Sequence, residues 1–152
     1  MCIRDSLVDW ADHEQLPELL RQMSVLVLPS AETVQRNVVP WVGIPLREQF
    51  GRVLVEAMAC GVPVVGSDVG EIGHVIGAAG MTYPAGNVAA LTSAITAVRD
   101  DPALARRLGS AGVERARSEF SWDRAALAMC EIWRRLAPAP ARGTGERKVM
   151  TS

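Results

Sequence analysis

The chain has 152 residues, of which 49% are hydrophobic and 22% are charged, a composition typical of one folded globular domain. Its 16 Lys and Arg residues against 17 Asp and Glu residues give a net charge of −1. The chain therefore lacks the basic surplus that would indicate a nucleic-acid partner. No uncharged apolar run approaches the roughly 18 residues that span a bilayer. Cys2, Cys60 and Cys130 are too few and too far apart to indicate a disulfide framework or a zinc cluster.

The N-terminus does not resemble the start of a complete domain. Residues 1–6 (MCIRDS) have no apolar core and are not a signal peptide. They resemble translated adapter sequence, and we treat them as a non-native start. Residues 7–10 are typical of the end of a strand, so we expect that upstream sequence is missing.

The next segments alternate between helices and strands. Apolar spacing predicts helices over residues 13–23, 50–60 and 71–76. Short apolar runs predict strands over residues 24–28, 62–65 and 80–83. Between them, residues 31–47 are predicted to form a long irregular loop, and residues 66–70 a turn-rich one. The alternation predicts an α/β Rossmann-like parallel sheet with flanking helices and right-handed crossovers.

The C-terminal part is predicted to be helical. Asn87 is the expected N-cap of a helix that extends to about residue 98. Asp101 and Pro102 open a second helix, which ends near residue 118. Ser121 is the expected N-cap of a last helix. The apolar stripe of that helix is expected to pack in a core: Met129, Ile132, Trp133 and Leu136. Residues 137–152 lack apolar periodicity and are predicted to be disordered.

Two carboxylates and a helix start carry the predicted chemistry. Glu48 lies before the helix and Glu56 within it, with seven residues between them. Unpaired amides near Phe50 and Gly51 favour a phosphate or diphosphate, and Gly51 lets the backbone approach a ligand closely. Because carboxylates accept hydrogen bonds from ribose hydroxyls, a nucleoside diphosphate could lie along this helix. Taken alone, the spacing fits a solvated helix face more often.

Several linked motifs then resemble one family. The sequence contains Pro29-Ser30, Glu48 to Glu56, the run AMACGVPVV at residues 57–65 and the run GSDVGEI at residues 66–72. In this order they resemble the donor-binding, C-terminal half of the GT-B glycosyltransferases, in particular the retaining Glu-x7-Glu family (group 1, or family 4, type). The resemblance covers residues 7–136, which we take as a partial nucleotide-sugar-binding domain.

The resemblance implies a role for each matching residue. Glu48 would contact the transferred sugar and is the candidate catalytic residue, whereas Glu56 would hold the ribose hydroxyls. Backbone amides of Phe50, Gly51 and Arg52 would contact the sugar or the diphosphate. The implied reaction is a hexosyltransferase-type transfer (EC 2.4) from a nucleotide diphosphate-sugar to an acceptor hydroxyl with retention, in glycan biosynthesis. No cofactor is expected, and no Asp-x-Asp motif is present to bind a metal.

The departures from the family matter as much. An Arg and a Lys that neutralise the diphosphate, and the whole acceptor-binding N-terminal domain, would precede residue 7. The chain alone is therefore expected to be inactive or nearly so. Arg47 and Arg52 are candidates for partial compensation, although a surface role is the commoner one. The 31–47 loop is longer than expected and apolar, so it packs either on its own domain or against the missing one.

Two other functions compete with this interpretation. One is a non-catalytic nucleotide-binding or interaction domain, and the other is a GT-B-type epimerase or phosphorylase, which would lack this Glu-x7-Glu context. His13 and His74 are most simply polar surface residues. The acceptor (a glycan, a lipid or a small molecule), the base and the sugar are not identified by the sequence. The expected location is cytoplasmic, with peripheral association at the inner membrane face as an alternative.

Overall fold

The computed structural model describes residues 11–35, 41 and 43–136. The chain divides into two compact units, residues 1–121 and residues 122–152. Within the described ranges, no helix combines the length and the apolar character needed to cross a membrane. The predictions for residues 1–10 and for the tail at 137–152 lie outside the described residues.

A parallel sheet forms the centre of the first unit. In the described part of the chain it has the strand order β1 (Leu26–Leu28), β4 (Val64–Ser67) and β5 (Met81–Tyr83). β4 is the central strand, and its Val65 pairs with Val27 of β1. All of β4 is buried, as expected for a parallel strand covered on both faces. The predicted parallel α/β architecture is confirmed.

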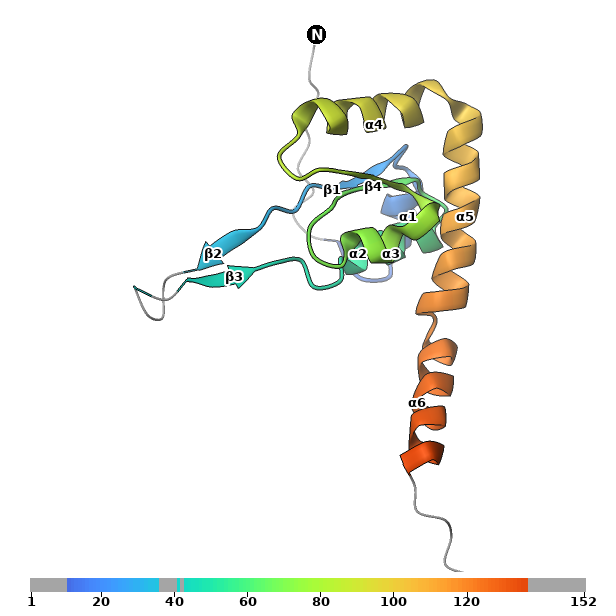
Figure 1. Ribbon diagram of the computed structural model, residues 1–152. Coiled ribbons are helices and arrows are strands. Elements are labelled where there is room, and N and C mark those ends of the chain that lie inside the picture. Colours follow the sequence, from blue (N-terminus) through green and yellow to red (C-terminus); the bar gives the residue numbers. More distant parts are fainter. Residues whose placement is uncertain (1–10, 36–40, 42, 137–152) are drawn as a thin grey trace, which may run out of the picture. The chain divides into compact units, whose positions relative to one another are not determined.

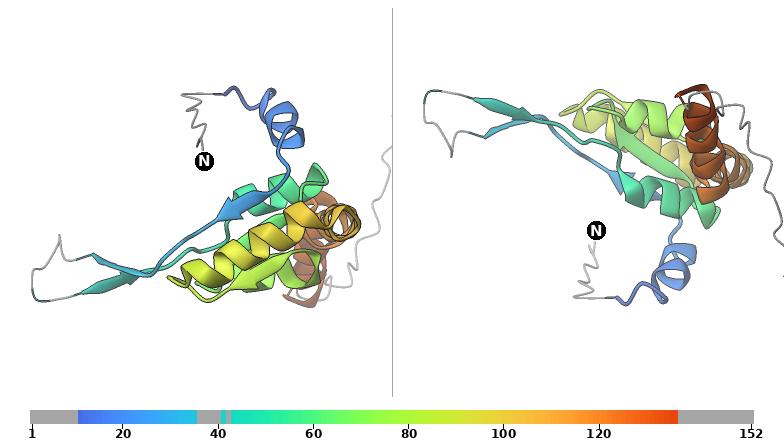
Figure 2. Two further views of the ribbon diagram at one scale, coloured as in Figure 1. Left: turned by 90° about the horizontal axis from the view of Figure 1, so that it is seen from above. Right: turned by 90° about the horizontal axis from the view of Figure 1, so that it is seen from below.

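Helices cover both faces of this sheet. α2 (Arg52–Ala59) and α3 (Ile72–Ile76) lie on one face, and α4 (Val88–Asp100) lies on the other (Figures 1 and 2). The pleat of β4 explains the division, because successive side chains point to opposite faces. Val64 accordingly belongs to the core cluster on the α2 and α3 side, and Val65 to the cluster on the α4 side. The first cluster includes Leu54, Met58, Ile72 and Ile76, and the second includes Tyr83, Ala94 and Val98.

The remaining helices of this unit complete the core. α5 (Pro102–Phe120) contributes Leu108 to the α4 cluster and Ala116 to the α2 and α3 cluster. α1 (Leu16–Arg21) is shorter than predicted and buries Leu20. A single 3₁₀ turn, η1 (Gly77–Ala79), connects α3 to β5.

The predicted N-caps Asn87 and Asp101 are confirmed. The Asn87 side chain accepts a hydrogen bond from the amide of Ala90 at 3.0 Å. The Asp101 carboxylate accepts hydrogen bonds from the amides of Ala103 and Leu104 at 2.9 and 3.0 Å. These acceptors satisfy donors that a helix start otherwise leaves unpaired, so local sequence defines where α4 and α5 begin.

The limits of β4 differ from the prediction of residues 62–65. The strand covers Val64–Ser67 and thus includes two residues that we expected in a loop. The reason is pairing with neighbouring strands, since Gly66 is in register with Leu28 on one side and with Thr82 on the other. Glycine has a poor strand propensity, which these partners override.

The prediction of an irregular loop over residues 31–47 is wrong toward both ends of the segment. β2 (Thr33–Gln35) and β3 (Ile44–Leu46) form an antiparallel pair in which Val34 is opposite Pro45. The two short strands project away from the sheet (Figure 1). Proline is tolerated because each strand of an isolated pair has an open edge that needs no amide donor.

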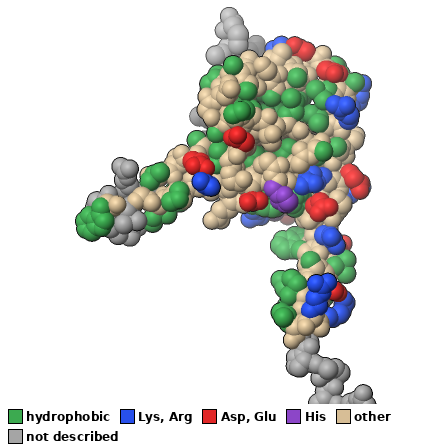
Figure 3. Space-filling model, in the orientation of Figure 1, with side chains coloured by type: hydrophobic (Ala, Val, Ile, Leu, Met, Phe, Trp, Pro, Cys, Tyr) green, Lys and Arg blue, Asp and Glu red, His purple; other side chains and the backbone are tan. Residues whose placement is uncertain are grey.

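The β2–β3 pair keeps apolar side chains at the surface. Val34, Ile44 and Leu46 are 58%, 47% and 45% exposed, and Trp41 between the strands is also exposed. Figure 3 shows hydrophobic side chains along this projection. The described apolar residues of the segment are therefore not packed in their own domain, which was one of the two expectations. The other expectation, contact with a missing domain, stays a prediction, and Val38, Val39 and Val42 lie outside the described residues.

The second unit contains α6 (Trp122–Leu136). None of its residues is buried. Leu127, Met129, Ile132, Trp133 and Leu136 are all exposed apolar side chains. The core packing predicted for the stripe from Met129 to Leu136 is therefore not observed.

Candidate functional site

The candidate site lies beyond the carboxyl ends of β1 and β4, where open α/β sheets usually bind ligands. Ser30 follows β1 by two residues, and Ser67 is the last residue of β4. The Ser67 hydroxyl donates a hydrogen bond to the backbone carbonyl of Ser30 at 2.7 Å. Ser67 is completely buried, so this bond ties the segment after β1 to the central strand.

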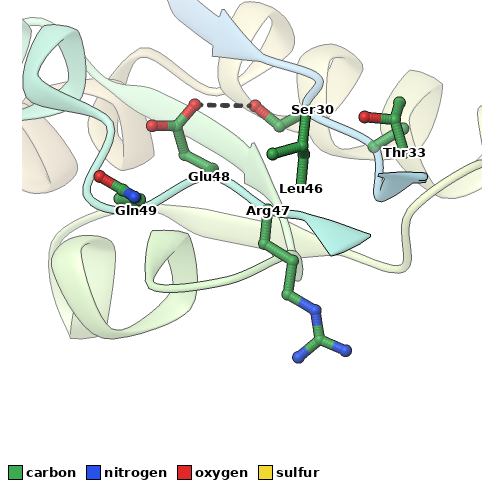
Figure 4. A pocket seen from close by; sticks show the side chains of 7 residues that line it. Ser30, Thr33, Leu46, Arg47, Glu48 and Gln49 are labelled. Carbon is green, nitrogen blue, oxygen red and sulfur yellow. Dashed lines mark hydrogen bonds between the residues drawn. The ribbon is translucent and has the colours of Figure 1, made fainter. Parts of the chain in front are cut away.

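Glu48 is held between this segment and the start of α2. Its Oε1 accepts a hydrogen bond from the amide of Gly51 at 3.0 Å, and its Oε2 accepts one from the Ser30 hydroxyl at 3.3 Å (Figure 4). Each carboxylate oxygen thus has one donor from the protein. The negative charge also lies at the N-terminal end of α2, where the helix dipole stabilises it. Glu48 is half-buried and keeps acceptor capacity toward solvent.

The backbone of Glu48 is fixed by the loop after β4. The amide of Glu71 donates to the Glu48 carbonyl at 3.3 Å. Gly70, with φ of 58°, packs so closely that an added Cβ would collide with the same carbonyl oxygen. Two loops that are far apart in sequence therefore meet at Glu48 because position 70 has no side chain.

Gly51 is required by the fold itself. It has φ of 69° and ψ of 57° and is the residue before the first turn of α2, which is the left-handed region that glycine favours. A Cβ there would lie 2.9 Å from Cδ2 of Leu28. The backbone conformation and the contact with Leu28 thus explain the glycine at position 51, which we expected to allow close approach of a ligand.

The neighbours of Gly51 lie on the surface. Phe50 is 38% exposed, and its ring meets that of Phe120 edge-on, with centroids 5.5 Å apart. Arg52 is exposed at the first position of α2. Its amide and that of Val53 belong to the first turn, whose amides have no intrahelical acceptor.

Two open cavities share Glu48. The first has a volume of about 490 Å³ and is lined by Ser30, Ala31, Thr33, Leu46, Arg47, Glu48 and Gln49. The second, of about 600 Å³, is lined by Glu32, Pro45, Arg47, Glu48, Gln49, Asp68, Gly70 and Glu71. Residues from the base of the β2–β3 pair line both. Thr33 and Leu46, which face each other across this pair, were not predicted, because only strand pairing brings them to the site.

The lining of the second cavity is mainly acidic. Its charged residues are Glu32, Glu48, Asp68, Glu71 and Arg47. The single cation is already paired, since Arg47 Nε lies 2.8 Å from Glu32 Oε1 at the surface. The lining of this cavity therefore carries four carboxylates and one cation. Among the described residues, no group of His, Cys, Asp or Glu is arranged to hold a metal ion.

The structure does not bring Glu56 into these cavities. Glu56 is half-buried in the second turn of α2 and, within the described part of the chain, lines neither cavity. His74 is exposed in α3, and its carbonyl accepts a hydrogen bond from Arg115. Ser67 was expected in the loop over residues 66–70, whereas it is the last residue of β4 and is completely buried.

Comparisons with known proteins identify the family of the chain. Residues 7–115 match the family described as glycosyl transferases group 1. D-inositol 3-phosphate glycosyltransferase of Streptomyces bingchenggensis (strain BCW-1) is 33% identical over 134 residues, which is 87% of this chain and 24% of that protein. The chain therefore spans about a quarter of the length of this relative.

Solved structures share the fold. Sucrose-phosphate synthase from Thermosynechococcus elongatus superposes with a TM-score of 0.70 at 35% identity, over 86% of this chain and 30% of that one. Anabaena HepE, solved in complex with UDP, gives 0.65 at 23% identity, over 78% and 29%. With the family match over residues 7–115 and a Rossmann-like half of the GT-B type, the chain belongs to the group 1 glycosyl transferases.

Proposed function

We propose that this chain is the donor-binding half of a glycosyltransferase that transfers a sugar from a nucleotide diphosphate-sugar to an acceptor hydroxyl with retention. The observation that carries the proposal is Glu48, a carboxylate held by two protein donors and open to two cavities at the start of α2. A carboxylate fixed in this way accepts hydrogen bonds from sugar hydroxyls without first having to be ordered. Family membership supports the reaction class.

The roles proposed for the other residues rest on the family resemblance and on their places in and before α2. Glu56 would accept hydrogen bonds from the ribose hydroxyls. The Gly51 amide is engaged by Glu48, so its contribution to the sugar would pass through that carboxylate. The amide of Arg52, beside that of Phe50, is left to face the diphosphate, where the positive end of the helix dipole favours an anion.

The acidic lining supports the proposal that the chain is inactive alone. Charge compensation on the leaving diphosphate is a large part of such catalysis, and Arg47 is paired with Glu32. Cations from elsewhere in a longer protein would be needed. The competing function is a non-catalytic nucleotide-binding or interaction domain, and failure to bind any nucleotide would favour the interaction domain. No cofactor or metal is required by either proposal.

Binding measurements distinguish the role proposed for Glu48 from that proposed for Glu56. Isothermal titration or ligand-observed NMR would use UDP, ADP and GDP with and without glucose, since the base is unknown. Glu56→Gln should weaken nucleoside diphosphate and sugar nucleotide alike, by about tenfold, as expected for hydrogen bonds to a charged group. Glu48→Gln should weaken only the sugar nucleotide. Glu119→Gln, the same change on an exposed face of α5, is the matched control.

Two outcomes would overturn the proposal. One is the absence of binding for every nucleotide in the panel, and the other is an affinity that neither carboxylate variant changes. Transfer or hydrolysis of the bound sugar nucleotide by the chain alone would contradict the proposed inactivity, while leaving donor binding intact.

A further inference from the structure

We propose that Ser30 is a positioning residue for the Glu48 carboxylate and that the buried Ser67 anchors Ser30 for this purpose. The functional importance of Glu48 in this inference rests on the function proposed above. The positioning itself is a property of the unliganded protein, so it can be tested separately.

Each oxygen of the Glu48 carboxylate accepts a hydrogen bond from the protein. The Gly51 amide donates to Oε1 and the Ser30 hydroxyl donates to Oε2. A single donor would leave the group free to turn about its last side-chain bond, whose torsion is broad in glutamate. The second donor, from a segment 18 residues earlier in the sequence, restricts that rotation. Figure 4 shows the Ser30 side chain directed at the carboxylate.

Ser30 can do this only if its own backbone is fixed. Ser30 belongs to the irregular stretch after β1, which has no strand partner at this residue. The Ser67 hydroxyl supplies the attachment, at 2.7 Å from the Ser30 carbonyl. Because Ser67 is 0% exposed, loss of this bond would leave a buried hydroxyl unsatisfied, which is costly. The result is a series of hydrogen bonds from the central strand through Ser30 to the carboxylate.

This arrangement determines what the first cavity presents to a ligand. The Ser30 hydroxyl gives its only hydrogen to Glu48, so it has none left to donate to a ligand. The two oxygens of Glu48 can only accept. Glu48 thus contributes two acceptor oxygens to the lining of a cavity of about 490 Å³, which suits a ligand group with adjacent hydroxyl donors. Positioning by Ser30 would then affect recognition of the sugar and leave recognition of the nucleotide unchanged.

A measurement without ligand tests the positioning directly. The Gly51 amide resonance in a ¹H–¹⁵N spectrum reports whether the carboxylate is in place, because Glu48 is its acceptor. Glu48→Ala gives the resonance of the unbonded amide. Ser30→Ala should move the Gly51 signal at least halfway toward that value, and Ser67→Ala should move it in the same direction. Ser30→Thr, which keeps the hydroxyl, should leave the signal near its wild-type position.

The binding measurement uses a double-mutant cycle. The ratio of affinities for UDP-glucose and UDP should fall about fivefold in Ser30→Ala, as for one hydrogen bond of average net strength, while the affinity for UDP stays unchanged. In a Glu48→Ala background, Ser30→Ala should have no further effect, because the group it positions is gone. A general folding defect would lower both affinities, which separates positioning from a merely structural role.

The inference is overturned if Ser30→Ala leaves the Gly51 resonance unmoved, or if Ser30→Thr moves it as far as Ser30→Ala does. It is also overturned if Ser30→Ala lowers the ratio equally with and without Glu48. Failure of the wild-type chain to bind UDP-glucose would instead count against the proposed donor function, and the Gly51 resonance would still decide whether Ser30 positions the carboxylate.

Discussion

Substitution of Gly70 tests how the two loops of the site are joined. Gly70 has a left-handed φ of 58°, and a Cβ at this position would collide with the carbonyl oxygen of Glu48. The same oxygen accepts the Glu71 amide at 3.3 Å. Gly70→Ala therefore introduces backbone strain and a steric conflict at once, and the conflict falls on the residue that carries the candidate chemistry.

The expected loss of stability has two parts. A left-handed conformation costs an alanine about 1–2 kcal/mol. Displacement of the Glu48 carbonyl adds the hydrogen bond from Glu71, which contributes about 1 kcal/mol net. Gly70→Ala should thus lower the free energy of unfolding by about 2–3 kcal/mol, before any movement of the Glu48 carboxylate is considered.

Variants of two other glycines distinguish the backbone strain from the steric conflict. Gly86 has φ of 78° but no atom within 4 Å of an added Cβ, so Gly86→Ala should cost only the strain, about 1–2 kcal/mol. Gly73 lies in α3 without a positive φ and also has open space around it. Gly73→Ala should stabilise the protein by about 0.5–1 kcal/mol, because alanine is the better helix former.

The stability of all three variants is measured by guanidinium denaturation, followed by far-UV circular dichroism. The m-value should be the same for each variant, so that a change in the midpoint reports a change in stability. From most to least stable, the expected order is Gly73→Ala, wild type, Gly86→Ala and Gly70→Ala. If Gly70→Ala is no less stable than Gly86→Ala, the loops are not in contact as described, and the backbone support of Glu48 has another origin.

Three further contacts make separate predictions. Gly109→Ala should destabilise the protein by about 2 kcal/mol, as measured by guanidinium denaturation, because the new Cβ would collide with the carbonyl oxygen of Gly61. Asp101→Ala should cost about 1 kcal/mol in the same assay through loss of the α5 cap, whereas Asp100→Ala, which removes an exposed ion pair, should change little. Arg115→Lys should lower the melting temperature, at a cost of about 1 kcal/mol, because lysine cannot reproduce both hydrogen bonds to the last carbonyls of α3. A wild-type midpoint for Gly109→Ala, equal losses for the two aspartates or an unchanged melting temperature for Arg115→Lys would each contradict the corresponding contact.

The layered core could be predicted because its signals are local. Val64 and Val65 are both apolar, and a strand with no polar alternation must be covered on both faces, as β4 is. Asn87 and Asp101 cap their own helices within three residues of chain. Gly61, with φ of 76°, follows α2 at the expected helix end.

The β2–β3 pair could not be predicted in the same way. Its strands have three residues each and include Pro45, so neither periodicity nor propensity identifies them. Pairing of Thr33 with Leu46 depends on residues more than ten positions apart. The extension of β4 through Gly66 has the same cause, since backbone partners on both sides decide it.

Chemical roles were predicted only for residues 48–56, although the motifs at residues 29–30 and 66–72 also carried the family resemblance. The spacing from Glu48 to Glu56 is visible in the sequence, but the supports of Glu48 come from three other places: Ser30, Ser67 and Gly70. Hydrogen bonds between distant segments leave no periodic pattern, so serine and glycine at these positions resemble ordinary loop residues. The role of Glu56 stays a prediction.

The state of the Gly51 amide links the fold to the proposed chemistry. A helix start can bind an external anion only with amides that no internal group already occupies, and Glu48 occupies the one at Gly51. The internal carboxylate and an incoming diphosphate would thus share one helix end, and like charges at that end oppose each other. Two features would offset this repulsion. One is the set of free amides in the first turn of α2 beyond Gly51. The other is a set of cations from elsewhere, because the lining of the second cavity is mainly acidic. If the proposed function holds, sugar recognition by Glu48 and charge compensation on the diphosphate are therefore expected to come from different parts of a longer protein.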